Sequence, residues 1–187
     1  KADGVWLTDI NGKRYLDAMA GLWCVNVGYG REEIAQAVYK QLVENNYTPL
    51  SASHESAILL AEKISELLED DYVVFFSNSG SEANETAFKI ARQYHQQNGA
   101  TDRFKILSRY RAYHGNTLGA LAATGQSERK YKYEPLAPGF LHVKAPDQYR
   151  FPEEAENAAD LPSVKAIDET MTWEHSETIA AMILEPI

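Results

Sequence analysis

Apolar and polar residues follow two different periods along this chain. Apolar residues recur every three to four positions over residues 32–46, 53–68 and 81–96, and this spacing predicts three amphipathic helices. A further helix is expected between residues 161 and 177. Four short apolar runs predict strands, and they cover residues 72–76, 104–107, 140–143 and 179–184. The last run contains no polar residue, so its strand is expected to be buried on both faces.

Residues near the start of the chain predict a small antiparallel unit. Residues 5–7 and 14–16 flank Asn11-Gly12, a pair that favours a tight turn, so they predict a β-hairpin. A glycine-rich loop is expected to follow over residues 22–31. Because strands alternate with helices in the rest of the chain, the sequence predicts an α/β fold with a mostly parallel sheet. Ligands of such a sheet bind at the carboxyl ends of its strands.

The turn that precedes the helix over residues 81–96 is the first candidate site. Ser79 and Glu82 form an S-x-x-E pattern, which is a capping box and fixes where this helix begins. The N-terminus of a helix carries unpaired N–H donors and about half a positive charge, so it suits a phosphate. Gly80 permits close approach to the backbone, and Ser81 adds a hydroxyl donor. The turn therefore predicts an anion-binding site.

Three other segments carry candidate residues. Tyr113, followed by His114 and Gly115 after a predicted strand, could offer a flat face to a planar ligand, or could belong to a plain surface loop. Glu185 follows the last predicted strand, where ligands bind, although a solvated strand end is the simpler interpretation. Trp23 lies in the glycine-rich loop, and its residue type alone favours a core position beside the hairpin.

Composition narrows the possible functions. The 187 residues have a net charge of −9, which argues against a nucleic-acid-binding surface. Cys24 is the only cysteine, so an internal disulfide is excluded, and a reducing, cytoplasmic setting fits. No run reaches 18 consecutive apolar residues, so no membrane span is expected. No pair of histidines has the spacing of metal ligands, so no metal site is expected either.

Three motifs, in this order along the chain, carry a resemblance to a known family. They are Ser79-Gly80-Ser81-Glu82-Ala83-Asn84-Glu85, Tyr113-His114-Gly115-Asn116-Thr117 and Ile183-Leu184-Glu185-Pro186. With residues 9–17 and 21–30, they resemble the class III, pyridoxal-phosphate-dependent aminotransferases, and within them the ω-amino-acid:pyruvate type. The resemblance extends over nearly the whole chain.

The resemblance implies a role for each matching position. The implied binding residues for pyridoxal 5'-phosphate are Ser79, Gly80, Ser81, Tyr113, His114, Gly115 and Glu185. Gly80 and Ser81 would hold the phosphate, and Tyr113 would stack on the pyridine ring. Glu185 would lie beside the cofactor. Trp23 would line the substrate pocket.

The resemblance also implies a longer protein. In the family, the Schiff-base lysine and the aspartate that pairs with the pyridine nitrogen follow the Glu-Pro motif, so both are expected beyond Ile187 and no catalytic residue is assigned here. Residues 1–50 would then belong to the small domain and a linking helix. Residues 51–187 would form the first part of the large cofactor-binding domain. The 187 residues alone are expected to be inactive.

The implied parent is a cytoplasmic homodimer of fold type I. It would move an amino group from an amine or ω-amino acid to a keto acid through pyridoxal phosphate. An aminomutase or a diamino-acid transaminase of the same family would use the same cofactor residues. The residues alone also leave open a non-catalytic α/β module that binds phosphate.

Overall fold

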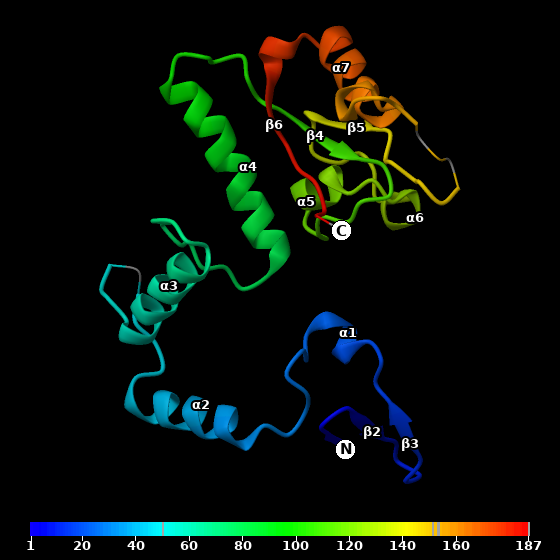
Figure 1. The fold of residues 1–187 in the computed structure, drawn as a ribbon. Helices are drawn as coiled ribbons and strands as arrows, with labels where there is room; N and C mark the ends of the chain where they lie inside the picture. Colours follow the sequence, from blue (N-terminus) through cyan, green and yellow to red (C-terminus); the bar gives the residue numbers. More distant parts are fainter. Residues whose placement is uncertain (50, 151, 153, 187) are drawn as a thin grey trace. The chain divides into compact units, whose positions relative to one another are not determined.

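The computed structural model describes residues 1–49, 51–150, 152 and 154–186. The chain forms two compact units, Lys1–Val74 and Phe75–Ile187, and each is described below by itself (Figure 1). Each unit has a three-stranded sheet, which is antiparallel in the first unit and parallel in the second. The α/β organisation predicted from the alternation of strands and helices is therefore confirmed.

The first unit combines a small sheet with two amphipathic helices. Its sheet has the order β1-β2-β3. Its elements are β1 (Ala2–Asp3), β2 (Trp6–Thr8), β3 (Arg14–Leu16), α2 (Glu32–Glu44) and α3 (Glu55–Leu67). Strands β2 and β3 pair across the Asn11-Gly12 turn, where Gly12 has a φ of +84°. None of the described residues of this unit is buried, so the apolar faces of both helices are exposed or half-buried.

The segment α1 (Ala20–Trp23) is a left-handed turn and not an ordinary helix. Its four residues all have positive φ values, of 47°, 60°, 58° and 68° in chain order. Because a Cβ atom crowds the carbonyl oxygen in this conformation, each of the three non-glycine residues is disfavoured by about 1–2 kcal/mol. The sequence predicts only a loop here. The turn must therefore be held by contacts from outside it.

The second unit contains the parallel sheet. Its strands are β4 (Lys105–Arg109), β5 (Phe140–Val143) and β6 (Ile179–Met182), in the order β5-β4-β6. Ile106 pairs with Phe140 on one side and with Ala181 on the other. The buried cluster of Phe88, Ile106 and Ala123 joins α4 (Gly80–Gln97), the sheet and α5 (Leu118–Ala123). These elements are labelled in Figure 1. This core fixes the start of α4 relative to the carboxyl ends of the strands.

The remaining helices show which sequence patterns were informative. The amphipathic spacing predicted α4 correctly, and α7 (Pro162–Trp173) lies where a further helix was expected. It missed α5 because Gly119, Ala120, Leu121, Ala122 and Ala123 are all buried, so this helix has no polar face. It also missed α6 (Ser127–Lys130), which has only four residues. Two short 3₁₀ helices, Ala158–Asp160 and Ser176–Thr178, flank α7.

Two strand predictions need correction. The prediction of a buried strand over residues 72–76 is wrong: these residues have no strand assignment, and Val73 is fully exposed. An apolar run becomes a strand only when another strand pairs with its N–H and C=O groups, and none of the described strands does so here. The strand predicted over residues 179–184 ends at Met182, and three of its four residues are only half-buried. Among the described strands, β6 is at the edge of the sheet.

Candidate functional site

The N-terminus of α4 is capped by the side chains of the predicted turn. Ser79 has an extended backbone, and its Oγ accepts a hydrogen bond from the N–H of Glu82 at 3.2 Å. Glu82 Oε2 accepts a hydrogen bond from the N–H of Asn78 at 2.9 Å. The predicted cap at Ser79 is confirmed, whereas the returning carboxylate bonds one residue before the N-cap that a capping box would use. A Cβ atom on Gly80 would meet no described atom within 4 Å, so the backbone there is open to a ligand.

The second motif lies directly against this helix end. Ser81 Oγ accepts a hydrogen bond from the N–H of Asn116 at 2.9 Å. Gly115 has a φ of +134°, and a Cβ atom there would lie 2.5 Å from Ser81 Oγ and 2.8 Å from Ala120 Cβ. Only glycine fits such an approach, and its backbone conformation is one that L side chains rarely adopt. The structure therefore brings Ser79, Gly80 and Ser81 together with the loop that contains Gly115.

Two further residues of α4 hold the same loop, and their roles were missed in the sequence. Glu85 Oε1 accepts hydrogen bonds from Thr117 Oγ1 at 2.5 Å and from the N–H groups of Gly119 at 2.9 Å and Ala120 at 3.1 Å. Asn84 Nδ2 donates to the carbonyl of His114 at 2.6 Å. Their spacing of three and four residues from Ser81 was the available signal, because it places all three on one face of the helix.

The carboxylate of Glu85 caps α5 from another element. Its burial favours the neutral acid, but the hydrogen bonds from Thr117, Ala120 and Gly119 outweigh this effect and hold the pKa of Glu85 below its ordinary value. An ionised carboxylate at the N-terminus of a helix is favoured by the unpaired N–H groups there. Glu85 therefore fixes the end of the loop over residues 113–117 to α4.

The third motif contacts the second through its glutamate. Glu185 Oε1 accepts a hydrogen bond from the backbone N–H of Tyr113 at 3.1 Å, although the two residues are 72 positions apart. The Tyr113 side chain is 38% exposed, and the guanidinium carbon of Arg129 lies 4.6 Å from the centroid of its ring. One face of the tyrosine is thus covered by a cation, a favourable arrangement for the electron-rich ring face.

His114 is buried beside these residues. Its backbone N–H donates to Thr124 Oγ1 at 3.0 Å, and Thr124 is itself fully buried. Burial lowers the pKa of the His114 imidazole, and the carboxylate of Glu185 acts in the opposite direction. Its Nε2 atom is buried and has no hydrogen-bond partner among the described residues. A buried polar atom without a partner costs free energy, so this nitrogen is suited to a group that the described residues do not supply.

A cavity opens where the three parallel strands end. It measures about 430 Å³, and its lining includes Arg109, Tyr110, Arg111 and Glu185. Asp147 accepts a hydrogen bond from Nη1 of Arg111 at 2.6 Å, which ties the loop after β4 to the loop after β5. The hydrogen bonds from Arg150 and Arg111 keep the pKa of Asp147 below its usual range. Ligand sites of parallel sheets lie at this end, so the cavity belongs to the candidate site.

Trp23 belongs to the first unit and is 74% exposed. Among the described residues of this unit, Trp23 is therefore not part of a core. The interpretation of Trp23 as a core tryptophan beside the hairpin is wrong. It is the last residue of the left-handed turn α1, so its side chain projects from a strained backbone and not from a packed face.

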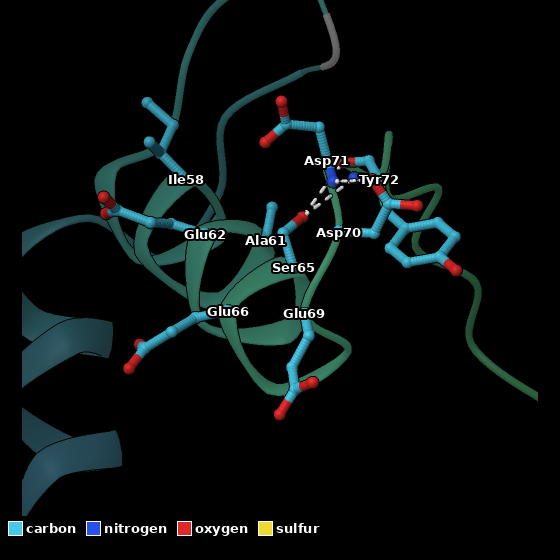
Figure 2. A pocket seen from close by; sticks show the side chains of 9 residues that line it. All are labelled: Ile58, Ala61, Glu62, Ser65, Glu66, Glu69, Asp70, Asp71 and Tyr72. Atoms are coloured by element: carbon cyan, nitrogen blue, oxygen red, sulfur yellow. Dashed lines mark hydrogen bonds between the residues drawn. The ribbon is translucent and has the colours of Figure 1, made fainter.

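A larger pocket in the first unit has unsuitable chemistry for an anion. It measures about 770 Å³ and lies between α3 and the segment that follows it. Five carboxylates line it, and they belong to Glu62, Glu66, Glu69, Asp70 and Asp71. Figure 2 shows that these carboxylates point away from one another, while Ser65 bonds to the backbone of Tyr72. Their negative charge repels a phosphate, so the start of α4 remains the candidate anion site.

The described residues contain neither a helix that could span a membrane nor a cluster of metal-binding side chains. No helix among them is both long and apolar enough to cross a membrane. No group of three or more His, Cys, Asp or Glu side chains within this part of the chain is arranged to hold a metal ion. The candidate site consists of the start of α4, the loop that contains Gly115, the ring of Tyr113 and the carboxylate of Glu185.

The chain is similar to known proteins over its whole length. A family model for class-III aminotransferases matches residues 1–187. The uncharacterized aminotransferase YhxA of Bacillus subtilis is 67% identical over 187 residues, which cover 100% of this chain and 41% of the relative. The taurine–pyruvate aminotransferase of Bilophila wadsworthia is 43% identical over 190 residues, with the same two shares. A solved aminotransferase of Bacillus anthracis is 64% identical with a TM-score of 0.96, covering 100% of this chain and 42% of that one. The chain spans about 41% of the length of these curated relatives.

Proposed function

Because this chain belongs to the class III aminotransferases, we propose that the whole protein moves an amino group from an amine or ω-amino acid to a keto acid. The family uses pyridoxal 5'-phosphate. The observation that carries the proposal is the continuous set of hydrogen bonds that joins the start of α4, the loop over residues 113–117 and Glu185. The taurine–pyruvate relative, whose name pairs an ω-amino sulfonate with a keto acid, supports the substrate class.

The start of α4 fits the phosphate of this cofactor. A hydroxyl has one donor and two acceptor sites, so Ser81 Oγ can accept from Asn116 and still donate its own proton to an anion. The open space at Gly80 permits contact with the backbone N–H groups. Charge-assisted hydrogen bonds of this kind contribute about 1.5–3 kcal/mol each. We assign the phosphate to Ser79, Gly80 and Ser81.

The loop after β4 fits the planar part of the cofactor. Arg129 covers one face of Tyr113, so we assign the pyridine ring to the opposite face. His114 and Gly115 shape this loop, and the unpartnered Nε2 of His114 is suited to a hydrogen-bonding group of the filled site. Glu185 orients the loop through the N–H of Tyr113 and lies beside the cofactor. These residues bind and orient, and none of them is assigned a proton-transfer step.

The chemistry itself requires groups beyond this set. When bound, pyridoxal phosphate supplies an aldehyde that takes up the amino group and a ring that accepts electrons. The transfer also needs a lysine that holds the cofactor and moves a proton, and a carboxylate at the pyridine nitrogen. We assign both outside these 187 residues, and we expect the 187 residues alone to be inactive.

Trp23 is assigned to the wall of the substrate pocket. Its exposed side chain, which ends a turn of four residues with positive φ, supports this assignment. We further propose a cytoplasmic homodimer of fold type I. Residues 1–50 would belong to its small domain and linking helix, and residues 51–187 to its large cofactor-binding domain.

Three alternatives are tested by the same experiment. An aminomutase would return the nitrogen to its own substrate, a diamino-acid transaminase would prefer diamino acids, and a phosphate-binding module would convert nothing.

The whole protein is incubated with the cofactor, pyruvate and one amine at a time, including β-alanine, taurine and 2,4-diaminobutyrate. Formation of alanine from β-alanine or taurine supports the proposal. Absence of alanine with every amine, despite bound cofactor, would contradict it.

A further inference from the structure

The left-handed turn α1 is held by one carboxylate. Asp17 Oδ1 accepts a hydrogen bond from the N–H of Met19 at 3.1 Å, and Oδ2 accepts one from the N–H of Gly21 at 2.7 Å. The hydroxyl of Tyr29 donates to the same Oδ2 at 2.9 Å. A carboxylate only accepts hydrogen bonds, and here its two oxygens accept three. Asp17 therefore fixes Met19, the residue directly before the turn, and Gly21, the second residue of the turn.

Both Asp17 and Tyr29 are anchored to the segment that joins β1 to β2. The N–H of Asp17 donates to the carbonyl of Val5 at 2.9 Å. Tyr29 exchanges two backbone hydrogen bonds with Gly4, at 2.8 and 3.1 Å. The hydrogen bond from Tyr29 lowers the pKa of Asp17, and the same bond raises the pKa of Tyr29. The carboxylate is thus ionised and held in place at neutral pH.

Close packing at Gly21 adds a second constraint on the turn. A Cβ atom there would lie 2.6 Å from Val25 Cγ2 and 2.9 Å from the hydroxyl of Tyr29. The turn then closes with hydrogen bonds from the N–H of Trp23 to Met19 at 2.9 Å and from the N–H of Val25 to Ala20 at 2.8 Å. The backbone direction at Trp23 is therefore determined by contacts that begin at Asp17.

Trp23 itself has little packing to hold it. Because 74% of its surface is exposed, the direction in which its ring projects depends on the backbone of α1. We propose that Asp17, with Tyr29, is a positioning residue that aims Trp23 and thereby sets the preference of the protein among amine donors. This inference rests on the assignment of Trp23 to the substrate pocket.

Asp9 supplies a matched control within the same unit. Its carboxylate also accepts two backbone hydrogen bonds, from Asn11 and Lys13, and one from the hydroxyl of Tyr15. These bonds hold the hairpin turn and not α1. Asp9→Asn therefore repeats the chemistry of Asp17→Asn at a carboxylate that bonds to the hairpin and not to α1.

The test uses the whole, cofactor-loaded protein and two donors of different bulk, β-alanine and 1-phenylethylamine. The ratio of their kcat/KM values is measured for wild type, Asp17→Asn, Tyr29→Phe and Asp9→Asn, and again in a Trp23→Leu background. We expect Asp17→Asn to change the ratio about threefold or more in the wild-type background and to have no effect once Trp23 is removed. Tyr29→Phe should act in the same direction, and Asp9→Asn should leave the ratio unchanged.

A second readout follows Trp23 without catalysis. In protein labelled with 5-fluorotryptophan, the ¹⁹F resonance that Trp23→Leu removes should shift in Asp17→Asn and stay unchanged in Asp9→Asn. An unchanged resonance together with an unchanged donor ratio in Asp17→Asn would overturn the inference. A donor ratio that Trp23→Leu itself leaves unchanged would instead overturn the pocket assignment. If Asp17→Asn does not fold, Tyr29→Phe decides by the same two measurements.

Discussion

The hydroxyl oxygen of Ser81 accepts a hydrogen bond from the backbone N–H of Asn116 at 2.9 Å, across 35 positions of sequence. This contact joins the helix end that we assign to the cofactor phosphate with the loop that we assign to the cofactor ring. The two parts of one ligand are thus oriented by residues that touch each other directly. A change at the contact should therefore affect cofactor binding more than it affects folding.

Gly115→Ala tests this contact. The added methyl group would lie 2.5 Å from Ser81 Oγ, and the backbone φ of +134° disfavours alanine. We expect cofactor affinity in the whole protein to fall by about 1–3 kcal/mol, as measured by titration with pyridoxal phosphate. Gly99→Ala is the control, because Gly99 also has a positive φ of +81° but has no described atom within 4 Å of the added group. Equal losses of affinity in both variants would contradict the role of the contact.

Glu85→Gln tests the attachment of α5 to α4, and its effect should depend on pH. Because the folded-state pKa of Glu85 is below the ordinary 4.5, its ionised form contributes stability that is complete above pH 4.5. That contribution is lost as the pH falls through the lower, folded-state value. At neutral pH we expect Glu85→Gln to destabilise the whole protein by about 1–3 kcal/mol, since bonds to two backbone N–H groups are weakened.

Denaturation of wild type and Glu85→Gln between pH 3 and pH 7 measures this dependence. The difference in stability between the two proteins should narrow as the pH falls below 4.5. Glu62→Gln, on the exposed surface of α3, is the control and should cost little at any pH. A difference for Glu85→Gln that stays constant over this range would show that the charge of Glu85 has no part in holding α5.

The sequence predicted local features of the fold and missed those that depend on distant residues. The N-cap at Ser79 was predictable because a cap depends on residues within one helical turn. The absence of a strand over residues 72–76 was not predictable, because strand formation depends on a pairing neighbour that the pattern of these residues cannot reveal. The same limit applies to α5, whose N-terminus is capped by Glu85 from 34 positions away and whose buried residues leave no amphipathic pattern.

The candidate site could likewise be predicted only in part from the sequence. The motifs identified Ser81, Tyr113 and Glu185 as residues of interest, since each lies at a helix start or after a strand. The sequence did not predict that Glu185 would bond to the backbone of Tyr113, because that contact depends on β4 and β6 being neighbours in the sheet. The left-handed turn that ends at Trp23 could not be predicted either, because residues other than glycine rarely adopt this conformation.

Tyr113→Phe and Tyr113→Ala test the stacking assignment. Phenylalanine keeps the flat face, so cofactor affinity should change little. Alanine removes that face and should lower affinity by about 0.5–1.5 kcal/mol beyond the loss of buried area. Tyr94→Ala, at an exposed tyrosine near the other end of α4, is the matched control and should leave cofactor affinity unchanged. An affinity loss in Tyr113→Phe as large as that in Tyr113→Ala would point to the hydroxyl and not to the ring face.

The position of the lysine that holds the cofactor is a separate prediction. Borohydride reduction of the cofactor-loaded whole protein, followed by peptide mapping, should find the cofactor on a lysine outside residues 1–187. The 187 residues alone should form no alanine from β-alanine and pyruvate. A stoichiometric adduct on one lysine within these residues, together with turnover by this chain alone, would contradict the assignment.

We propose that the protein transfers nitrogen between two molecules while its cofactor is held at the start of α4. The most direct measurement incubates the whole protein with ¹⁵N-labelled β-alanine, pyruvate and pyridoxal phosphate, and follows the label by mass spectrometry. Wild type should produce ¹⁵N-alanine, and Gly80→Val, which blocks the open backbone, should do so far more slowly at limiting cofactor. Label that stays on the donor, or equal rates in both proteins at every cofactor concentration, would contradict the account.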